Sequence, residues 1–421
     1  MDSSPPGPNN CFDPRIGLIP IADAEKALLD EVVPIADTEV VSLPDAVGRI
    51  LAEPVASTID VPPHANSAMD GYAVCGDSLP SDGVHRFTVV GTALAGKPWE
   101  HPCQPDETVQ VMTGAVMPQG TDTVVIQEDV QLENQIAIVS AGHRTGQNVR
   151  QAGEDLERDE TAVDAGVRVG AAELGVLASV GVGRVCVFRK PIVAIFSTGD
   201  ELRNAGDDLP PGAIYDSNRY TLIGLLQSMG LEILNLGIIP DDPVHTRTAL
   251  ADASDRADLI ITSGGVSTGS ADFVIRTLEE LGQISLWRIA IRPGRPFAFG
   301  KIQDKLFFGL PGNPVAVMVT FYKLVQPALR RLMGQSDVNP VPIMKARALS
   351  RFRKKPNRSE VYRAVLSQDD NGEPVVVSTG QQGSGLLSSM SQANCFVLLD
   401  DHAASVNPGD MVDVQLFEGL N

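Results

Sequence analysis

Polar and acidic residues follow four apolar segments in the middle of the chain, each at the point where the apolar segment ends. These polar segments are 198–201 (TGDE), 241–242 (DD), 263–272 (SGGVSTGSAD) and 311–314 (PGNP). Carboxylates that meet at one edge repel one another unless a proton or a cation lies between them, and Mg2+ takes one or two carboxylates together with water and phosphate oxygens. The pattern therefore predicts a bound Mg2+. Each acid taken singly could instead be a helix N-cap or a solvated loop residue, and for Asp242, directly before a proline, the N-cap is the favoured interpretation.

The segment 263–272 is built mainly from small residues, among them Ser263, Gly264, Gly265 and Ser267. Small residues let backbone N–H groups wrap around an anion at the start of a helix, where the helix dipole favours negative charge. This predicts a cradle for a phosphate or a pterin. A single loop of this kind is more often an ordinary turn, but four polar loops at one sheet edge favour a ligand site.

Three arginines, Arg288, Arg292 and Arg295, lie in the segment LWRIAIRPGRPFAFG at 286–300. The alternation of basic and apolar residues in this segment, together with its two prolines, could hold the guanidinium groups near the sheet edge that carries the polar loops. There they could bind an oxyanion through paired hydrogen bonds. The alternative is a solubilising basic loop, and for any one of these arginines the two interpretations are equally good.

The elements that must position these loops are strands and helices that alternate from residue 191. The expected strands are 191–198, 231–239 and 258–264, and the expected helices are 217–230, 243–256 and 271–282. Apolar strands that alternate with amphipathic helices predict a parallel sheet covered on both faces, with ligands beyond the carboxyl ends of the strands. Two further strands, 296–300 and 305–310, precede a long helix from Pro314 to Met333.

The remaining chain predicts additional domains around this one. A helix is expected at 21–33, a helix start with proline in its first turn at 42–45, short β-rich pieces from 61 to 150, a helix at 170–181, and short strands after 339. The predicted organisation is a flexible segment 1–14, a helical domain 15–60 with 154–187, an inserted β domain 61–153, an α/β domain 188–338 and a C-terminal β domain 339–421.

Composition excludes several classes of protein. A formal charge of -20 without a long basic run argues against nucleic acid as a partner. No apolar run is long enough to span a bilayer and no leader pattern is present, so we expect no membrane partner. The five scattered cysteines form no C-x-x-C pair, which fits a reducing cytoplasm. Dinucleotide, P-loop and serine-esterase motifs are missing from the sequence.

Eight motifs taken together strongly resemble the MoeA family, which is related to the C-terminal domain of gephyrin. They are ANSAMDGYAV, VMTGAVMP, GQNVRQAGEDL, FSTGDEL, NLGIIPDDP, SGGVSTGSADF, PGRPFAFGK and GLPGNPVA, and the resemblance covers the chain from about residue 16 to its end. It implies a homodimer of four-domain subunits, with a molybdopterin-binding α/β domain, an inserted β domain in a helical domain, and a C-terminal β-barrel-like domain.

The resemblance further implies a molybdenum insertase. Its substrate would be adenylated molybdopterin, made by an upstream molybdopterin adenylyltransferase and cleaved with Mg2+ and molybdate to give AMP and molybdenum cofactor. The implied catalytic acids are Asp70 and Asp155 from one subunit, and Glu201, Asp241 and Asp272 from the other, with Glu201 and Asp272 assigned to the metal. Further substrate-binding residues implied are Thr113, from the same subunit as Asp70 and Asp155, together with Pro311, Asn313, Arg363 and Ser384.

One departure and two alternatives remain at this point. The family commonly has lysines in the K-P-G-K-P-F stretch, where this chain has Arg292 and Arg295. The positive charge is kept, but a planar guanidinium group replaces a compact ammonium group at each position. The alternatives are a gephyrin-like scaffold without turnover, and insertion of tungstate, which has nearly the shape of molybdate.

Overall fold

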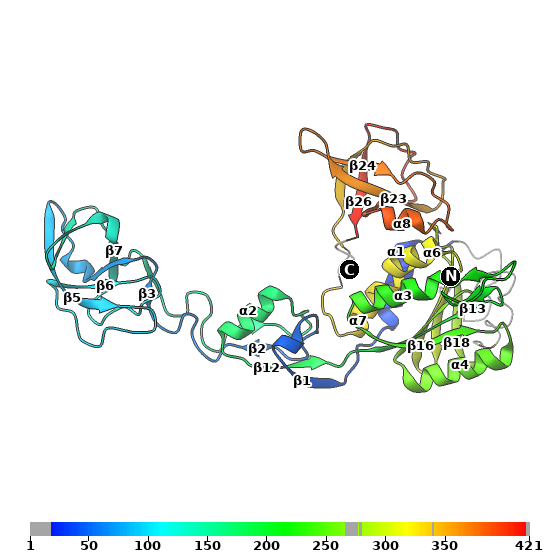
Figure 1. The fold of residues 1–421 in the computed structure, drawn as a ribbon, viewed down its shortest axis with the longest axis horizontal. Helices are drawn as coiled ribbons and strands as arrows, with labels where there is room; N and C mark the ends of the chain where they lie inside the picture. Colours follow the sequence, from blue (N-terminus) through cyan, green and yellow to red (C-terminus); the bar gives the residue numbers. More distant parts are fainter. Residues whose placement is uncertain (1–17, 266–276, 278–279, 339–340, 418–421) are drawn as a thin grey trace, which may run out of the picture. The chain divides into compact units, whose positions relative to one another are not determined.

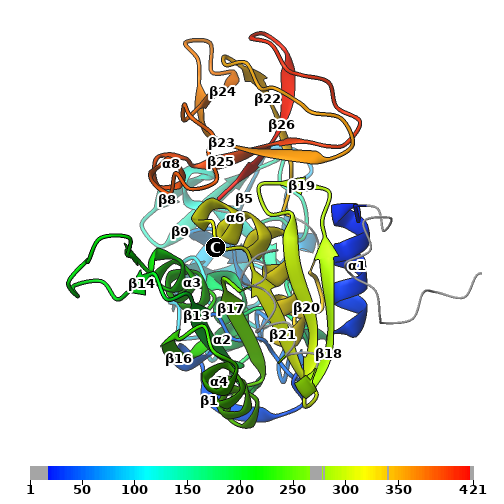
Figure 2. The same ribbon diagram turned by 90° about the vertical axis from the view of Figure 1, so that its right-hand side faces the viewer.

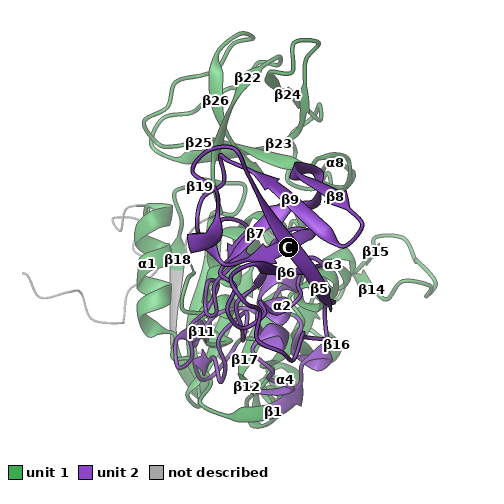
Figure 3. Ribbon diagram, turned by 90° about the vertical axis from the view of Figure 1, so that its left-hand side faces the viewer, with its two compact units in different colours: residues 1–39, 48–50, 187–421 green, residues 40–47, 51–186 purple. Residues whose placement is uncertain are grey.

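A computed structural model describes residues 18–265, 277, 280–338 and 341–417, which form two compact units (Figures 1 and 3). One unit comprises Met1–Glu39, Gly48–Ile50 and Val187–Asn421, and the other Val40–Val47 and Leu51–Cys186. The predicted flexible segment 1–14, most of the predicted helix 271–282, and the predicted site residues Ser267 and Asp272 lie outside the described residues.

The first unit contains a six-stranded sheet in the order β16-β13-β17-β21-β20-β18. Its strands are β13 (Ile192–Thr198), β16 (Glu232–Ile239), β17 (Leu259–Ser263), β18 (Gly282–Arg288), β20 (Pro296–Ile302) and β21 (Lys305–Leu310). The first four strands in that order are parallel, β20 pairs antiparallel with β21, and β18 pairs antiparallel with β20 at the edge (Figure 2). The predicted parallel sheet is confirmed, and a pair of strands joined by antiparallel pairings extends it.

Helices cover both faces of this sheet, because alternate residues of each buried strand point to opposite sides. Val193 and Ile195 of β13 pack with α1 (Ile21–Glu31), α3 (Ser217–Ser228) and the long helix after β21. Ala194 and Phe196 pack instead with α4 (Pro243–Arg256) on the other face (Figure 1). A strand buried on both faces reads as one continuous apolar run, which is how β13 and β17 appear in the sequence.

The long helix predicted from Pro314 to Met333 forms, but with an interruption. It consists of α6 (Pro314–Thr320), a π-helical turn η4 (Phe321–Val325) and α7 (Gln326–Leu332). Pro327 has no N–H to donate to the preceding turn, and a π turn is one way for a helix to accommodate that loss.

The C-terminal strands close into a barrel. The ring consists of β22 (Met344–Ala348), β23 (Ser359–Gln368), β24 (Pro374–Ser378), β25 (Cys395–Leu399) and β26 (Met411–Leu416), and the β23–β25 pairing closes it. The short strand β19 (Ile291–Arg292) pairs with β23, and α8 (Ser388–Gln392) packs beside the ring. A closed ring leaves no free edge, which confirms the predicted barrel-like domain.

The second unit is mostly β structure. Its six-stranded sheet has the order β7-β4-β6-β5-β9-β8 and is formed by β4 (Gly71–Val74), β5 (Val84–Ala93), β6 (Glu107–Val111), β7 (Thr123–Ile126), β8 (Val130–Glu133) and β9 (Ile136–Ser140). The strand pairs β2–β11 (Val55–Ala56, Thr161–Val163) and β3–β10 (Asn66–Ser67, Val149–Arg150), the helix α2 (Ala171–Ser179), and the 3-10 turns η2 (Gly76–Ser78) and η3 (Gln127–Asp129) complete it.

Five short elements remain in the described part of the chain. Strands β1 (Thr38–Ser42) and β12 (Arg184–Phe188) lie where the chain passes between the units, and β14 (Leu202–Arg203) pairs with β15 (Ile214–Tyr215). The expected helix start at 42–45 forms only the 3-10 turn η1 (Pro44–Ala46), although Ser42 does donate a hydrogen bond to the Asp45 carboxylate at 2.5 Å. No helix in the described ranges is both long and apolar enough to cross a bilayer.

Candidate functional site

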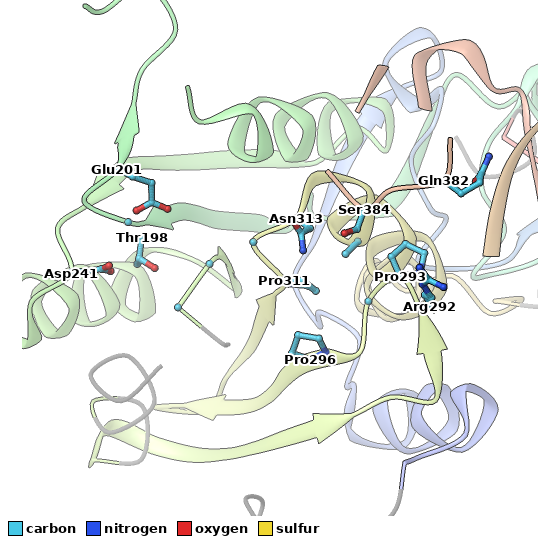
Figure 4. A pocket seen from close by; sticks show the side chains of 16 residues that line it. Thr198, Glu201, Asp241, Arg292, Pro293, Pro296, Pro311, Asn313, Gln382 and Ser384 are labelled. Atoms are coloured by element: carbon cyan, nitrogen blue, oxygen red, sulfur yellow. The ribbon is translucent and has the colours of Figure 1, made fainter. Parts of the chain in front are cut away.

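A cavity of about 450 Å³ opens at the carboxyl edge of the parallel strands (Figure 4). Strand β13 lies between β16 and β17, so the chain leaves β13 toward one neighbour and returns to the other. Such a switch point separates the connecting loops and creates a crevice at the strand ends. The loops after β13, β16, β17 and β21 all contribute to the lining, which comprises Thr198, Gly199, Glu201, Asp241, Gly264, Gly265, Arg292, Pro293, Gly294, Pro296, Pro311, Gly312, Asn313, Ala316, Gln382 and Ser384.

Gly264 permits the close approach of two strand ends on which this crevice depends. Its φ is +92°, a conformation that favours glycine. A Cβ atom at this position would lie 2.8 Å from the backbone oxygen of Thr198, so any side chain here would push the ends of β13 and β17 apart. The glycine-rich start of the predicted cradle is thus explained by packing between strands as well as by access to a ligand.

Acidic side chains gather at one end of the cavity. Glu201 and Asp241 line it, and the backbone N–H of Asp241 donates to the Asp200 carboxylate at 3.2 Å. Burial raises the pKa of Asp241, and the negative charges of Asp200 and Glu201 raise it further. No lysine or arginine contributes to that shift, so the cluster is one that a divalent cation would stabilise.

The acidic end fits an ion that shares its coordination with a substrate. Within the described part of the chain, no group of three His, Cys, Asp or Glu residues could hold a metal ion. Mg2+ usually uses only one or two carboxylates and completes its shell with water and phosphate oxygens. Glu201 and Asp241 meet that requirement, whereas the predicted ligand Asp272 lies outside the described residues.

Two buried oxygens beside the acids lack a hydrogen-bond partner. Thr198 Oγ1 finds none among the described residues, and neither does Asn218 Oδ1. The amide nitrogen of Asn218 is fully engaged, donating to Ser263 Oγ and to the Gly312 carbonyl at 2.8 Å each. An unpaired buried oxygen costs stability, so the Thr198 hydroxyl, which lines the cavity, is available to a ligand.

A buried ion pair fixes the segment that carries Glu201. Asp216, the N-cap of α3, accepts hydrogen bonds from Arg219 Nε at 2.9 Å and from Ser197 Oγ at 3.1 Å. Arg219 also donates to the side-chain oxygens of Asn204 and Asn235. The network ties the end of β13, the segment after Glu201, and β16 to the start of one helix.

The opposite end of the cavity carries a cation and amides. Figure 4 shows Arg292 and Gln382 on the side away from Glu201 and Asp241, with Asn313 and Ser384 between the two ends. Asn313 is the N-cap of α6 but makes no side-chain cap hydrogen bond, so its amide is free for a ligand. The cavity thus presents carboxylates at one end and a guanidinium group at the other.

Arg363 holds the loop from which Gln382 and Ser384 project. Its side chain is buried and donates to Ser389 Oγ at 2.9 Å and to the carbonyls of Gly383 and Gln382 at 2.9 and 3.3 Å. Burial lowers its pKa to about 10. Its hydrogen bonds commit the guanidinium group to Ser389 and to the loop carbonyls, so Arg363 positions the loop without lining the cavity.

The structure brings together about half of the residues predicted for the site. Those that line the cavity are Glu201, Asp241, Gly264, Gly265, Arg292, Pro311, Asn313 and Ser384. Ser263 is buried directly behind it, while Arg288 and Arg295 are exposed and do not line it. Asp242 is the N-cap of α4 and accepts from the backbone N–H groups of Val244 and His245, which confirms its expected role.

Three predicted residues belong to the other unit. Asp70 accepts hydrogen bonds from the backbone N–H and the hydroxyl of Thr113, at 2.7 and 2.8 Å, and these bonds lower the pKa of Asp70. Thr113 and Asp155 are exposed. Asp70 is thus held as a carboxylate in a fixed orientation at the end of the loop before β4.

Thr198 and Gln382 line the cavity but were not predicted as site residues, although Thr198 lies in the predicted loop 198–201. Thr198 directly precedes the glycine of the TGDE segment, and its position at a strand end was a usable signal. Gln382 carries no charge and lies in the barrel, where only Arg363 and Ser384 had been singled out.

Comparison with known proteins finds matches over most of the chain. Family models described as the MoeA N-terminal region (domain I and II), a probable molybdopterin binding domain and the MoeA C-terminal region (domain IV) match residues 19–181, 194–331 and 345–417. The molybdopterin molybdenumtransferase of Haemophilus influenzae is 39% identical over 96% of this chain and 100% of that protein. Gephyrin of Dictyostelium discoideum is 33% identical over 96% of this chain and 63% of its own length.

Solved structures agree with the sequence comparison. A molybdopterin biosynthesis MoeA protein from Pyrococcus horikoshii is 28% identical, with a TM-score of 0.82 over 95% of this chain and 100% of that chain. Another structure of a MoeA protein described as from the same source is 31% identical, with a TM-score of 0.75 over 95% of this chain. The chain therefore belongs to the MoeA family of molybdopterin molybdenumtransferases, enzymes of molybdenum cofactor biosynthesis.

Proposed function

We propose that this enzyme cleaves adenylated molybdopterin in a Mg2+-dependent reaction and inserts molybdate into the pterin dithiolene, releasing AMP and molybdenum cofactor. The observation that carries the proposal is the separation of charge within one cavity, with Glu201 and Asp241 at one end and Arg292 at the other. Two anionic substrates need different partners: a diphosphate is bound to carboxylates only through a cation, whereas a free oxyanion is bound directly by cations.

At the acidic end, Glu201 and Asp241 would hold Mg2+, with Asp272 as a further ligand implied by the family resemblance. The ion would neutralise charge on the phosphoryl oxygens of the anhydride. Thr198 contributes its unpaired hydroxyl as a donor to an oxygen of the bound diphosphate. Gly264 and Gly265 line the cavity without side chains, so that group could approach their backbone.

At the other end, Arg292, Asn313 and Ser384 are the groups for the pterin and the oxyanion. A planar guanidinium group donates two parallel hydrogen bonds to an oxyanion, and amide and hydroxyl groups can donate hydrogen bonds to its remaining oxygens. Arg363 supports this end by fixing the loop of Ser384. Arg288 and Arg295 have no role in the cavity as the structure presents it.

The proposal extends to assembly and location. The enzyme would act as a homodimer in which Asp70, Thr113 and Asp155 of one subunit complete the site of the other, and it would receive its substrate from a molybdopterin adenylyltransferase. A cytoplasmic location is supported by the free thiols of the four cysteines in the described ranges, Cys75, Cys103, Cys186 and Cys395.

The decisive experiment incubates purified protein with adenylated molybdopterin, Mg2+ and molybdate, and follows AMP release and activation of a molybdenum-free apoenzyme. Molybdate-dependent AMP release together with apoenzyme activation is expected, with tungstate run in parallel to define the preferred oxyanion. Tight binding of the adenylate without turnover would overturn the proposal and favour a scaffold.

The variant Glu201→Gln tests the acidic end directly. It removes one charge from the cavity, so the Mg2+ concentration for half-maximal rate should rise at least tenfold. The matched control is Asp208→Asn, an exposed acid on the same segment that does not line the cavity. An equal response of both variants would argue against a metal role for Glu201.

A further inference from the structure

A second cavity, of about 730 Å³, adjoins the first in the same unit. It is lined by Arg292, Pro293, Arg351, Phe352, Arg353, Lys355, Glu360, Val361, Tyr362, Ser378, Gly380, Gln381, Gln382 and Gly383. Arg292, Pro293 and Gln382 also line the first cavity, so the two share a wall. The shared residues are those of the cationic end, far from Glu201 and Asp241 (Figure 4).

The second cavity carries an excess of positive charge. Arg351, Arg353 and Lys355 are exposed, and none of the three forms an ion pair with any acid in the described ranges. The one acid of the lining, Glu360, is buried and already bound by Arg358 at 2.9 Å. Glu360 lies 3.9 Å from Arg292, so Arg292 is only loosely held, and its side chain is 54% exposed.

This concentration of cations departs from the rest of the chain. The segment 351–358 (RFRKKPNR) carries five lysines and arginines and no acid, whereas the whole sequence has 33 basic and 53 acidic residues. Cations on a solubilising surface are normally interspersed with acids. A run of unpaired cations around a concave surface attracts and concentrates anions instead.

The cavity wall is also preorganised. Phe352 and Val361 are buried in its wall, and the hydroxyl of Tyr362 donates to the backbone carbonyl of Arg353, which fixes the segment between β22 and β23 that carries that arginine. On the other side, Arg363 holds the carbonyls of the loop 381–383. Fixed walls lower the entropic cost of binding a small ligand.

We infer that the cavity lined by Arg351, Arg353 and Lys355 is an entry site for the free tetrahedral oxyanion, which passes from there to the first cavity beside Arg292. The inference rests on the proposed insertion of molybdate. A dianion that approached from the acidic end would be repelled by Asp200, Glu201 and Asp241, whereas the shared wall carries Arg292 and no acid.

The test is the double variant Arg351→Gln/Arg353→Gln, with Lys345→Gln/Arg347→Gln as the matched control. The control removes the same charge from the same barrel at residues that line neither cavity. For the double variant we expect a KM for molybdate about tenfold higher, with kcat at saturating molybdate and KM for adenylated molybdopterin unchanged. Conservative replacement by Arg351→Lys/Arg353→Lys should restore most of the loss.

Equilibrium dialysis with molybdate alone separates this inference from the proposed function. If the wild type binds molybdate and the double variant binds it at least fivefold more weakly, the entry site is supported even where no AMP is released. An unchanged KM and unchanged binding would overturn the inference and leave the proposed function intact. A rise in the KM for the adenylated substrate would also overturn it, because the cavity would then hold the phosphate of that substrate.

Discussion

The buried pair Asp216–Arg219 gives a stability prediction with a defined magnitude. The two side chains are 1% and 6% exposed, and Asp216 Oδ2 lies 2.9 Å from Arg219 Nε. In Asp216→Ala the guanidinium group would remain buried without its carboxylate, and α3 would lose its N-cap. Removing one partner of such a pair costs about 3–5 kcal/mol, against about 0.3–0.5 kcal/mol for an exposed i,i+4 pair.

The control for that prediction is Asp252→Ala, which breaks the exposed pair with Arg256 on α4. Calorimetry should show the transition of the unit that contains α3 falling by roughly 6–20 °C in Asp216→Ala, at about 2–4 °C per kcal/mol for a domain of this size. The control should shift by no more than about 2 °C. A double variant, Asp216→Leu/Arg219→Met, should recover part of the loss. A loss below about 1 kcal/mol in Asp216→Ala would refute the assignment of this network as the anchor of the Glu201 segment.

Three further predictions concern titration, loop anchoring and assembly. Burial lowers the pKa of Lys323 from 10.5 to about 8, so between these pH values the unfolded chain binds more protons and the free energy of unfolding rises with pH. Urea unfolding of Lys323→Met over this pH range should show no such rise, and the variant should be more stable at pH 7 by at most about 3 kcal/mol. An unchanged slope of unfolding free energy against pH would contradict this. Arg363→Met should cost roughly 2–4 kcal/mol because several loop carbonyls lose their donor, with Arg363→Lys failing to rescue it in calorimetry; full rescue by lysine would show that charge alone matters. Mixing inactive Asp70→Ala and Glu201→Ala proteins should restore about a quarter of wild-type AMP release, since half of the dimers would be mixed and each would hold one intact site; no recovery after proven subunit exchange would exclude a shared site.

The main features of the fold could be predicted because they follow from local patterns. Helix α4 begins and ends at the residues expected, since Asp242 and Pro243 mark its start and apolar residues recur at helical spacing. The cavity loops could be located because parallel strands place their carboxyl ends at one edge. The helix bounds and the loop positions can be inferred from residues that are adjacent in the chain and from the spacing of the apolar residues.

The parts that could not be predicted depend on contacts between distant segments. The loop carbonyls that accept hydrogen bonds from Arg363 lie about twenty residues away in the chain, so the sequence around Arg363 could not predict that its side chain is buried. The three arginines at 288–295 were expected to act together, yet β18 ends at Arg288 in an antiparallel ladder and only Arg292 faces the cavity. Which residue of a short basic segment reaches a site is decided by strand pairing, and local alternation does not specify it.

The π-helical turn η4 makes the length of its segment as important as its composition. A π turn closes its hydrogen bonds from residue i to residue i+5, so it holds one residue more than a turn of α-helix. Removing one residue between Phe321 and Val325 would convert the turn to regular α-helix and keep the buried face of α7 in register. Inserting a residue there would instead rotate all of α7 by about 100° and move the fully buried Leu329 to the position of Arg330. The fold should therefore tolerate the loss of one residue from this turn far better than the gain of one.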